Sequence, residues 1–136
     1  MNRRRGFTFI ELLVVMLLLG ALSSIAVPRF REYKVRAFQA AMQSDLGNLK
    51  IAEEVYWADN QKYATDTSAL EFRITSDVAI SITSQDILGG YTAVATHSAV
   101  PGLRCQTAIG KESAPREPGM IFCGPVTSGS SAIPSP

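Results

Sequence analysis

The stretch that decides the fold is the apolar run FTFIELLVVMLLLGALSSIAV, which occupies residues 7–27. As a helix, these 21 residues would rise about 31 Å, which is close to the thickness of a bilayer core. Between Leu12 and Leu22 the run contains no polar side chain. We therefore expect a membrane-length helix near the amino terminus.

One carboxylate, Glu11, lies near the start of this run. Burial at mid-bilayer would cost it roughly 2.5 to 3.5 kcal/mol on insertion scales, so its presence needs a reason. One explanation is a position at headgroup level, where the helix dipole favours an anion. On composition alone, a conventional signal peptide also fits, with residues 3–5 as its charged start and cleavage between Ala26 and Val27.

The string GFTFIELLVV, residues 6–15, follows the short basic leader MNRRR and resembles the prepilin signature of type IV pilins and type II secretion pseudopilins. The resemblance implies that residues 1–6 are a leader, that a prepilin peptidase cuts between Gly6 and Phe7, and that the new amine of Phe7 is N-methylated. Gly6 has no Cβ, which suits close approach of a protease. Cleavage would leave 130 of the 136 residues and change the net charge from +1 to −2, because three arginines are lost.

The resemblance also implies a role for Glu11 in assembly, because the family's glutamate is thought to pair with the terminal amine of a neighbouring subunit. At ~4 Å and an effective dielectric of about 20, such a pair gains roughly 4 kcal/mol, comparable to the cost of bringing the carboxylate into lipid. Gly20 and Pro28 match positions between which related pilins lose helical order in the fibre. The alternative is that Pro28, which lacks an N–H, only kinks the helix.

Basic residues flank the apolar run on both sides, so the positive-inside rule does not determine the orientation of the chain. Four basic residues follow the run, with Glu32 as the only acidic residue among them: Arg29, Arg31, Lys34 and Arg36. Such a basic cluster beside a membrane segment usually contacts lipid headgroups. The resemblance and the cysteine usage place the head in the periplasm. The expected precursor is a single-pass inner-membrane protein that later enters a surface pilus or a periplasmic pseudopilus.

We expect the helix to continue past the membrane to about Asn60, since apolar residues recur at spacings of three, four or seven: Phe38, Met42, Leu49, Ala52 and Tyr56. Alternating patterns then predict strands over residues 72–82, 91–97, 103–109 and 120–123. A helix followed by consecutive strands favours an α+β fold, in which a small antiparallel sheet packs on the amphipathic half of the helix.

The predicted organisation has three parts. Residues 1–6 form the leader, residues 7–28 form a transmembrane and polymerisation helix, and residues 29–136 form the head with a flexible tail from residue 124. The tail is rich in Gly, Pro and Ser and shows no periodicity.

Cys105 and Cys123 are the chain's only cysteines, and they lie on predicted strands that flank a loop rich in Gly and Pro. A disulfide is the leading interpretation, with reduced core thiols or a metal pair as alternatives; His97 is the only histidine, which disfavours a metal site. Closing the loop would contribute roughly 3 kcal/mol and would need an oxidising compartment. The bridge resembles the carboxyl-terminal disulfide loop of many pilins, which major pseudopilins commonly lack.

Composition and motifs argue against catalysis and nucleic-acid binding. A chain of 136 residues with 46% hydrophobic and 18% charged residues is typical of one globular domain, and a net charge of +1 offers no basic excess for phosphate contacts. The sequence has no HExxH motif, no Gly-x-Ser-x-Gly elbow and no glycine-rich phosphate loop. We therefore predict no enzyme activity, no cofactor, no metal site and no nucleic-acid partner.

These observations predict a structural subunit of a type IV pilus or pilus-like filament. Its expected partners are a prepilin peptidase, copies of itself and other pilins, the pilus or type II secretion assembly machinery, and membrane lipid. A type II secretion pseudopilin is the first alternative. The second is a secreted monomeric binding domain released by conventional signal-peptide cleavage.

Overall fold

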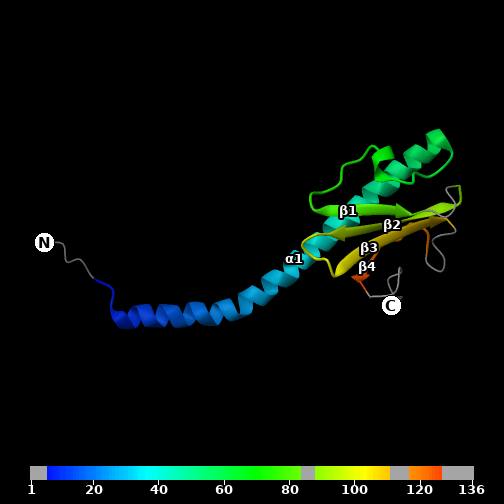
Figure 1. Ribbon diagram of the computed structural model, residues 1–136. Coiled ribbons are helices and arrows are strands. Elements are labelled where there is room, and N and C mark those ends of the chain that lie inside the picture. The colour runs from blue at the N-terminus through cyan, green and yellow to red at the C-terminus, as the bar shows by residue number, and fades with distance from the viewer. Residues whose placement is uncertain (1–5, 84–87, 111–116, 127–136) are drawn as a thin grey trace. The chain divides into compact units, whose positions relative to one another are not determined.

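The computed structural model describes residues 6–83, 88–110 and 117–126. Within these ranges a long helix, α1 (Phe9–Asn60), precedes a short 3-10 helix, η1 (Thr67–Ala69). Four strands follow: β1 (Val78–Thr83), β2 (Gly90–His97), β3 (Leu103–Gly110) and β4 (Phe122–Pro125). The chain divides into two compact units, Met1–Val35 and Arg36–Pro136, and α1 runs from the first into the second (Figure 1). The predicted α+β class is confirmed.

The sheet is an antiparallel meander in which each strand pairs with the next along the chain, in the order β1-β2-β3-β4. Its register aligns Ile80 with Ala95, Ala95 with Cys105, and Cys105 with Cys123. Residues in such a row share one face of the sheet, because side chains alternate along each strand. This row lies on the core face, since Ala95 and Cys105 are fully buried.

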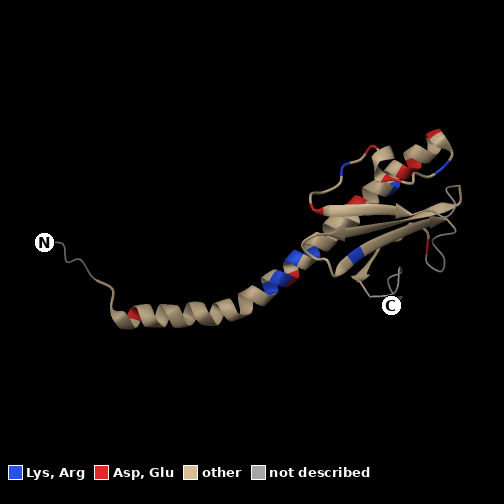
Figure 2. Cartoon of the chain, in the orientation of Figure 1, with Lys and Arg blue, Asp and Glu red and all other residues tan. Residues whose placement is uncertain are grey.

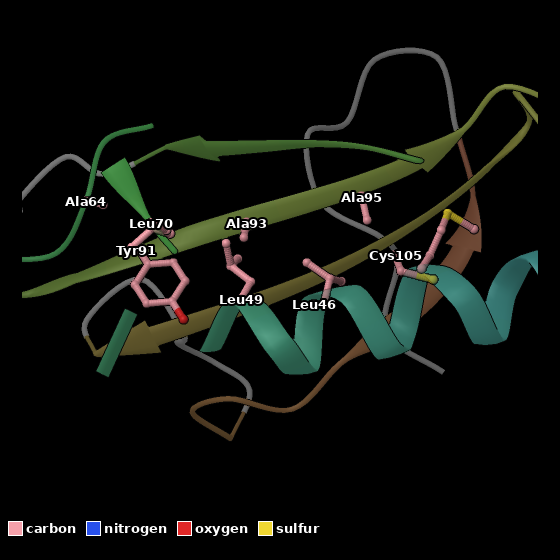
Figure 3. Close-up of a cluster of buried hydrophobic side chains, with 9 residues drawn as sticks. Leu46, Leu49, Ala64, Leu70, Tyr91, Ala93, Ala95 and Cys105 are labelled. Carbon is pink, nitrogen blue, oxygen red and sulfur yellow. The ribbon is translucent and has the colours of Figure 1, made fainter. Parts of the chain in front are cut away.

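The core forms where the second half of α1 packs on this face. Met42, Leu46 and Leu49 of α1 are fully buried, and Figure 3 shows Leu46 and Leu49 beside β2 and β3. On β2 the facing residues Ala93 and Ala95 are small, which lets the helix approach the sheet closely. The core is completed by Tyr91 and by residues of the segment between α1 and β1: Ala64 and Leu70.

Two predicted strand boundaries are wrong. The first strand begins at Val78 and not at residue 72, because Asp77 adopts a positive φ of 67° and the Val78 N–H donates to the Thr75 carbonyl in a turn. The last strand covers Phe122–Pro125 and not residues 120–123, because the Met120 N–H donates to the Glu117 carbonyl in another turn. The strands predicted over 91–97 and 103–109 are confirmed, each extended by one glycine.

The tail prediction needs one correction. Gly124 and Pro125 belong to β4, and the Val126 N–H donates to the Gly102 carbonyl, so these three residues are part of the folded head. The remainder of the predicted tail, residues 127–136, lies outside the described residues.

Candidate assembly site

The start of α1 is a reciprocal cap between Thr8 and Glu11. The Thr8 N–H and hydroxyl each donate to the Glu11 carboxylate at 3.4 Å, and the Glu11 N–H lies 3.3 Å from the Thr8 hydroxyl oxygen. This is the capping-box arrangement, in which a Thr before the first turn and a Glu three residues later satisfy amides that lack helical partners. The cap explains why the helix begins at Phe9 and not at Phe7. Within one chain, Glu11 therefore stabilises its own helix start.

The apolar run after this cap is exposed along its whole length. Every residue from Gly6 to Ala37 is exposed, including the large apolar side chains of residues 12–19. By length and composition this part of α1 is apolar enough to cross a membrane, a test that an amino-terminal signal sequence also passes. In Figure 2 it is uncharged apart from the carboxylate near its start, and the next charges follow further along the helix. So much unburied apolar surface requires lipid or another protein to cover it.

The predicted cleavage residues lie just before the cap. Gly6 and Phe7 are exposed, and a Cβ built on Gly6 would meet nothing within 4 Å. A larger side chain at position 6 would therefore clash with no described part of this chain. A requirement for glycine there would come from the peptidase, and the cleavage and methylation roles of Gly6 and Phe7 remain predictions.

The segment between Gly20 and Pro28 is α-helical in this structure. Pro28 has no N–H to offer the Ser24 carbonyl, and the Ser24 hydroxyl donates to the Ala21 carbonyl at 2.8 Å. The loss of helical order expected here concerns the assembled fibre, so it remains a prediction.

The basic cluster after the run makes local contacts. Arg29 and Glu32 form an exposed ion pair at 3.7 Å, and the Lys34 ammonium lies 4.9 Å from the centre of the Phe30 ring. Exposed pairs of this kind contribute little to stability. The charges of the cluster thus remain available to lipid headgroups.

In the head, two buried carboxylates that the sequence analysis missed join α1 to the following segment. The Asp45 carboxylate, 3% exposed, accepts from both the N–H and the hydroxyl of Thr75, each at 2.9 Å. Glu53, fully buried, accepts from the Ala64 N–H at 2.9 Å. Both carboxylates lie on the helix face that carries Leu46, and their spacing of eight residues is a helical repeat that could have revealed them.

A third polar contact joins α1 to the segment before β4. The Lys50 ammonium donates to the Gly119 carbonyl at 2.7 Å. Gly119 has a φ of +76°, and a side chain there would also crowd Lys50. The Gly119 N–H in turn donates to the Ala108 carbonyl of β3 at 2.7 Å. Lys50 therefore links the helix to the strand pair that carries the cysteines.

The two cysteines form a disulfide, which confirms the leading interpretation. They are directly opposed on β3 and β4, so the bridge reinforces the pairing of the short last strand. His97 packs its ring against Phe38 with centroids 4.3 Å apart, and its Nδ1 accepts from the Ala99 N–H at 3.1 Å. His97 is thus a packing residue in this structure.

Comparisons with known proteins bear on the amino-terminal part first. The family described as "Prokaryotic N-terminal methylation motif" matches residues 1–27. The type II secretion system core protein G of Klebsiella pneumoniae is 35% identical over 91 residues, which cover 67% of this chain and 65% of that protein. The core protein G of Aeromonas hydrophila is 34% identical over 90 residues, covering 66% of this chain and 63% of that protein.

A type IV pilin is also similar. The type IV major pilin protein PilA of Myxococcus xanthus is 31% identical over 70 residues, which cover 52% of this chain and 32% of that protein. The chain thus spans between about one third and two thirds of the length of these three relatives. The prepilin-type motif and homology to both groups are established by these matches.

Proposed function

Starting from this prepilin-type motif and its pilin and pseudopilin homologues, we propose that the chain is a structural subunit of a type II secretion pseudopilus. Most of the relatives are core protein G of the type II secretion system, and the alignment with the Klebsiella protein covers about twice the share of the relative that the pilin alignment covers. This observation carries the choice of the secretion system over the pilus that the sequence analysis favoured.

The proposed life cycle begins in the inner membrane. The exposed apolar half of α1 spans the bilayer, and the head lies in the periplasm, where the Cys105–Cys123 bridge forms under oxidising conditions. A prepilin peptidase removes residues 1–6 and methylates the amine of Phe7. The domain boundaries proposed for the precursor are therefore 1–6, 7–28 and 29–136.

Assembly follows from the chemistry of Glu11. In one chain its carboxylate caps α1 through Thr8, with exposed hydrogen bonds of 3.3 to 3.4 Å that are longer than ideal. After cleavage, the positive amine of Phe7 on a neighbouring subunit offers a stronger, charge-assisted partner. We propose that exchange of the weak local cap for this intermolecular pair drives the helix out of lipid and into the filament.

The proposal is tested by characterising the mature chain in its host. Mass spectrometry of the protein extracted from membranes should find an amino terminus at Phe7 that carries one methyl group. Gly6→Ala should accumulate as the uncut precursor, whereas Gly20→Ala, matched in size and equally open in this structure, should be cut normally. A mature terminus at Val27 would replace the filament proposal with a conventionally secreted domain.

A second experiment separates the two kinds of filament. Deletion of the gene should abolish export of proteins by the type II system and leave surface pili intact. Loss of surface pili with normal export would instead support the type IV pilus, the candidate favoured by the disulfide and by the similarity to the Myxococcus pilin.

A further inference from the structure

Two adjacent carboxylates near the end of α1 have opposite surroundings. The Glu53 side chain is 0% exposed, whereas Glu54 is exposed. They are the same residue type at consecutive positions of one helix. Differences in their behaviour therefore come from burial, which makes Glu54 a matched control for Glu53.

Glu53 holds the segment that follows the helix. Its Oε2 accepts from the N–H of Ala64, eleven residues later, at 2.9 Å, and Ala64 is itself buried. Ala64 belongs to residues 61–70, here called the post-helix segment, which also places the Tyr63 ring 5.1 Å from the Tyr91 ring of β2. This hydrogen bond therefore holds the post-helix segment against α1.

The surroundings of Glu53 disfavour an anion. Its Oε1 and the Tyr91 hydroxyl are both buried, and neither has a hydrogen-bond partner within the described residues. A neutral carboxyl carries its proton on one oxygen and keeps the other as an acceptor, so it preserves the Ala64 bond without a buried charge. Full burial with one carboxyl oxygen unpartnered therefore disfavours the charged form at this place, although the Ala64 amide by itself would favour it.

The acidic groups around Glu53 also disfavour its charged form. Burial raises the pKa of Glu53 more than the Ala64 amide lowers it, and the negative charge of Glu54 raises it further. From the post-helix segment and from β2 it faces Tyr63 and Tyr91, whose own pKa values are raised by burial and by the two glutamates. Lys50, one turn earlier on α1, donates to the Gly119 carbonyl.

We propose that Glu53 is a proton-controlled tether, whose neutral carboxyl holds the post-helix segment on α1 and whose ionisation releases that segment towards solvent. Because its pKa is raised in the docked state, docking is fully stabilised below the ordinary pKa of glutamate. This stabilisation is lost as the pH rises through the docked-state pKa, since the hydrated carboxylate of the released segment is then preferred. The tether is therefore strongest in acid.

Hydrogen exchange of the full chain in detergent micelles tests the tether. Protection of peptides within residues 61–70, corrected for intrinsic exchange, should fall as the pH rises from about 4 to about 8, by up to about tenfold per unit of pKa difference. Glu53→Gln keeps an acceptor for the Ala64 amide and cannot ionise, so its protection should not change with pH. Glu54→Gln should remain pH-dependent, with the transition shifted slightly to lower pH because one negative charge beside Glu53 is removed.

Three outcomes would overturn the tether: constant protection in the wild type, an unchanged pH dependence in Glu53→Gln, or its loss in Glu54→Gln. A measurement on the wild type keeps the proposal testable should Glu53→Gln fail to fold. In a carbon-13 NMR titration of the full chain, one glutamate carboxyl that is still present in Glu54→Gln should titrate above the ordinary value, and its pKa should fall slightly in that variant because the neighbouring charge is lost. Titration of all glutamates at or below that value would also refute the proposal.

Discussion

The two halves of α1 share one backbone conformation but depend on different partners. Residues 9–35 are exposed throughout, and the side-chain contacts of their described residues are local, as in the Thr8–Glu11 cap. Residues 36–60 bury Met42, Leu46 and Leu49 against the sheet. The apolar face of the second half is therefore covered by the chain's own sheet. The apolar surface of the first half must be covered by lipid or by another protein.

The acidic residues of the two halves differ in the same way. Glu11 is exposed and pairs with a residue three positions away, whereas Asp45 and Glu53 are buried and bind segments 30 and 11 residues away. Loss of Glu11 should leave the head intact and affect assembly, whereas loss of Asp45 or Glu53 should affect the head itself.

The largest expected effect comes from Glu11→Ala. The variant should be cleaved and inserted normally but should yield fewer filaments by more than about tenfold, because the proposed pair with a neighbour's terminal amine would be worth roughly 4 kcal/mol at an effective dielectric of about 20. Filament yield is measured as the amount of this protein that an immunoblot detects in the filament fraction sheared from the cells. Glu32→Ala, in the same helix beyond the apolar run, serves as the control, and a normal yield from Glu11→Ala would refute the assembly role.

The next effect distinguishes the buried and exposed faces of the second half of α1. Leu46→Ala should destabilise the head by about 2–5 kcal/mol, because it leaves a cavity under the sheet. Ile51→Ala, at a residue that is 67% exposed, should change stability by no more than about 0.5 kcal/mol. Urea unfolding in detergent, followed by fluorescence of the single Trp57, measures both. Equal losses would contradict the packing described for α1.

Removal of the disulfide should have an intermediate effect. Replacement of Cys105 and Cys123 by serine should cost about 3 kcal/mol, because the bridge closes a loop between residues 18 positions apart. The same unfolding assay, run with and without a reductant, measures the loss. The reductant should destabilise the wild type alone, so a reductant effect on the double variant would count against this explanation.

The smallest effect is expected for Asp45→Ala. It should cost about 1–3 kcal/mol, because the Thr75 N–H and hydroxyl lose their acceptor. Asp59→Ala, at an exposed position of the same helix, is the matched control and should be nearly neutral. Comparable losses from the two variants would show that burial of Asp45 does not decide its contribution.

The strand errors show where pattern alone is insufficient. Phe72 and Ile74 alternate with Arg73 and Thr75, which imitates a strand, yet Phe72 packs on the core from a loop. The Thr75 N–H that could have entered a ladder is taken by Asp45. Apolar and polar residues do alternate here, but Phe72 is placed by contact with the core and Thr75 by its hydrogen bond to α1.

Asp45 and Glu53 were missed for a related reason. Their positions on the helix face that carries Leu46 could have indicated burial, but their partners depend on the chain's return after Asn60. By contrast, Thr8 and Glu11 carry the T-x-x-E spacing of a capping box, so this contact was available from the sequence. Contacts within one turn are encoded locally, whereas contacts across the fold are not.

The amino-acid sequence by itself determined the membrane-length helix, its prepilin-type start and the α+β class, because these depend on apolar content, short spacings and the change of period after Asn60. Only the tertiary structure decided that Cys105 faces Cys123 across a strand pair and that Asp45 and Glu53 bind the segment after α1. Such contacts join residues far apart in the chain. Their partners are selected by how the helix and sheet pack, which no local pattern records.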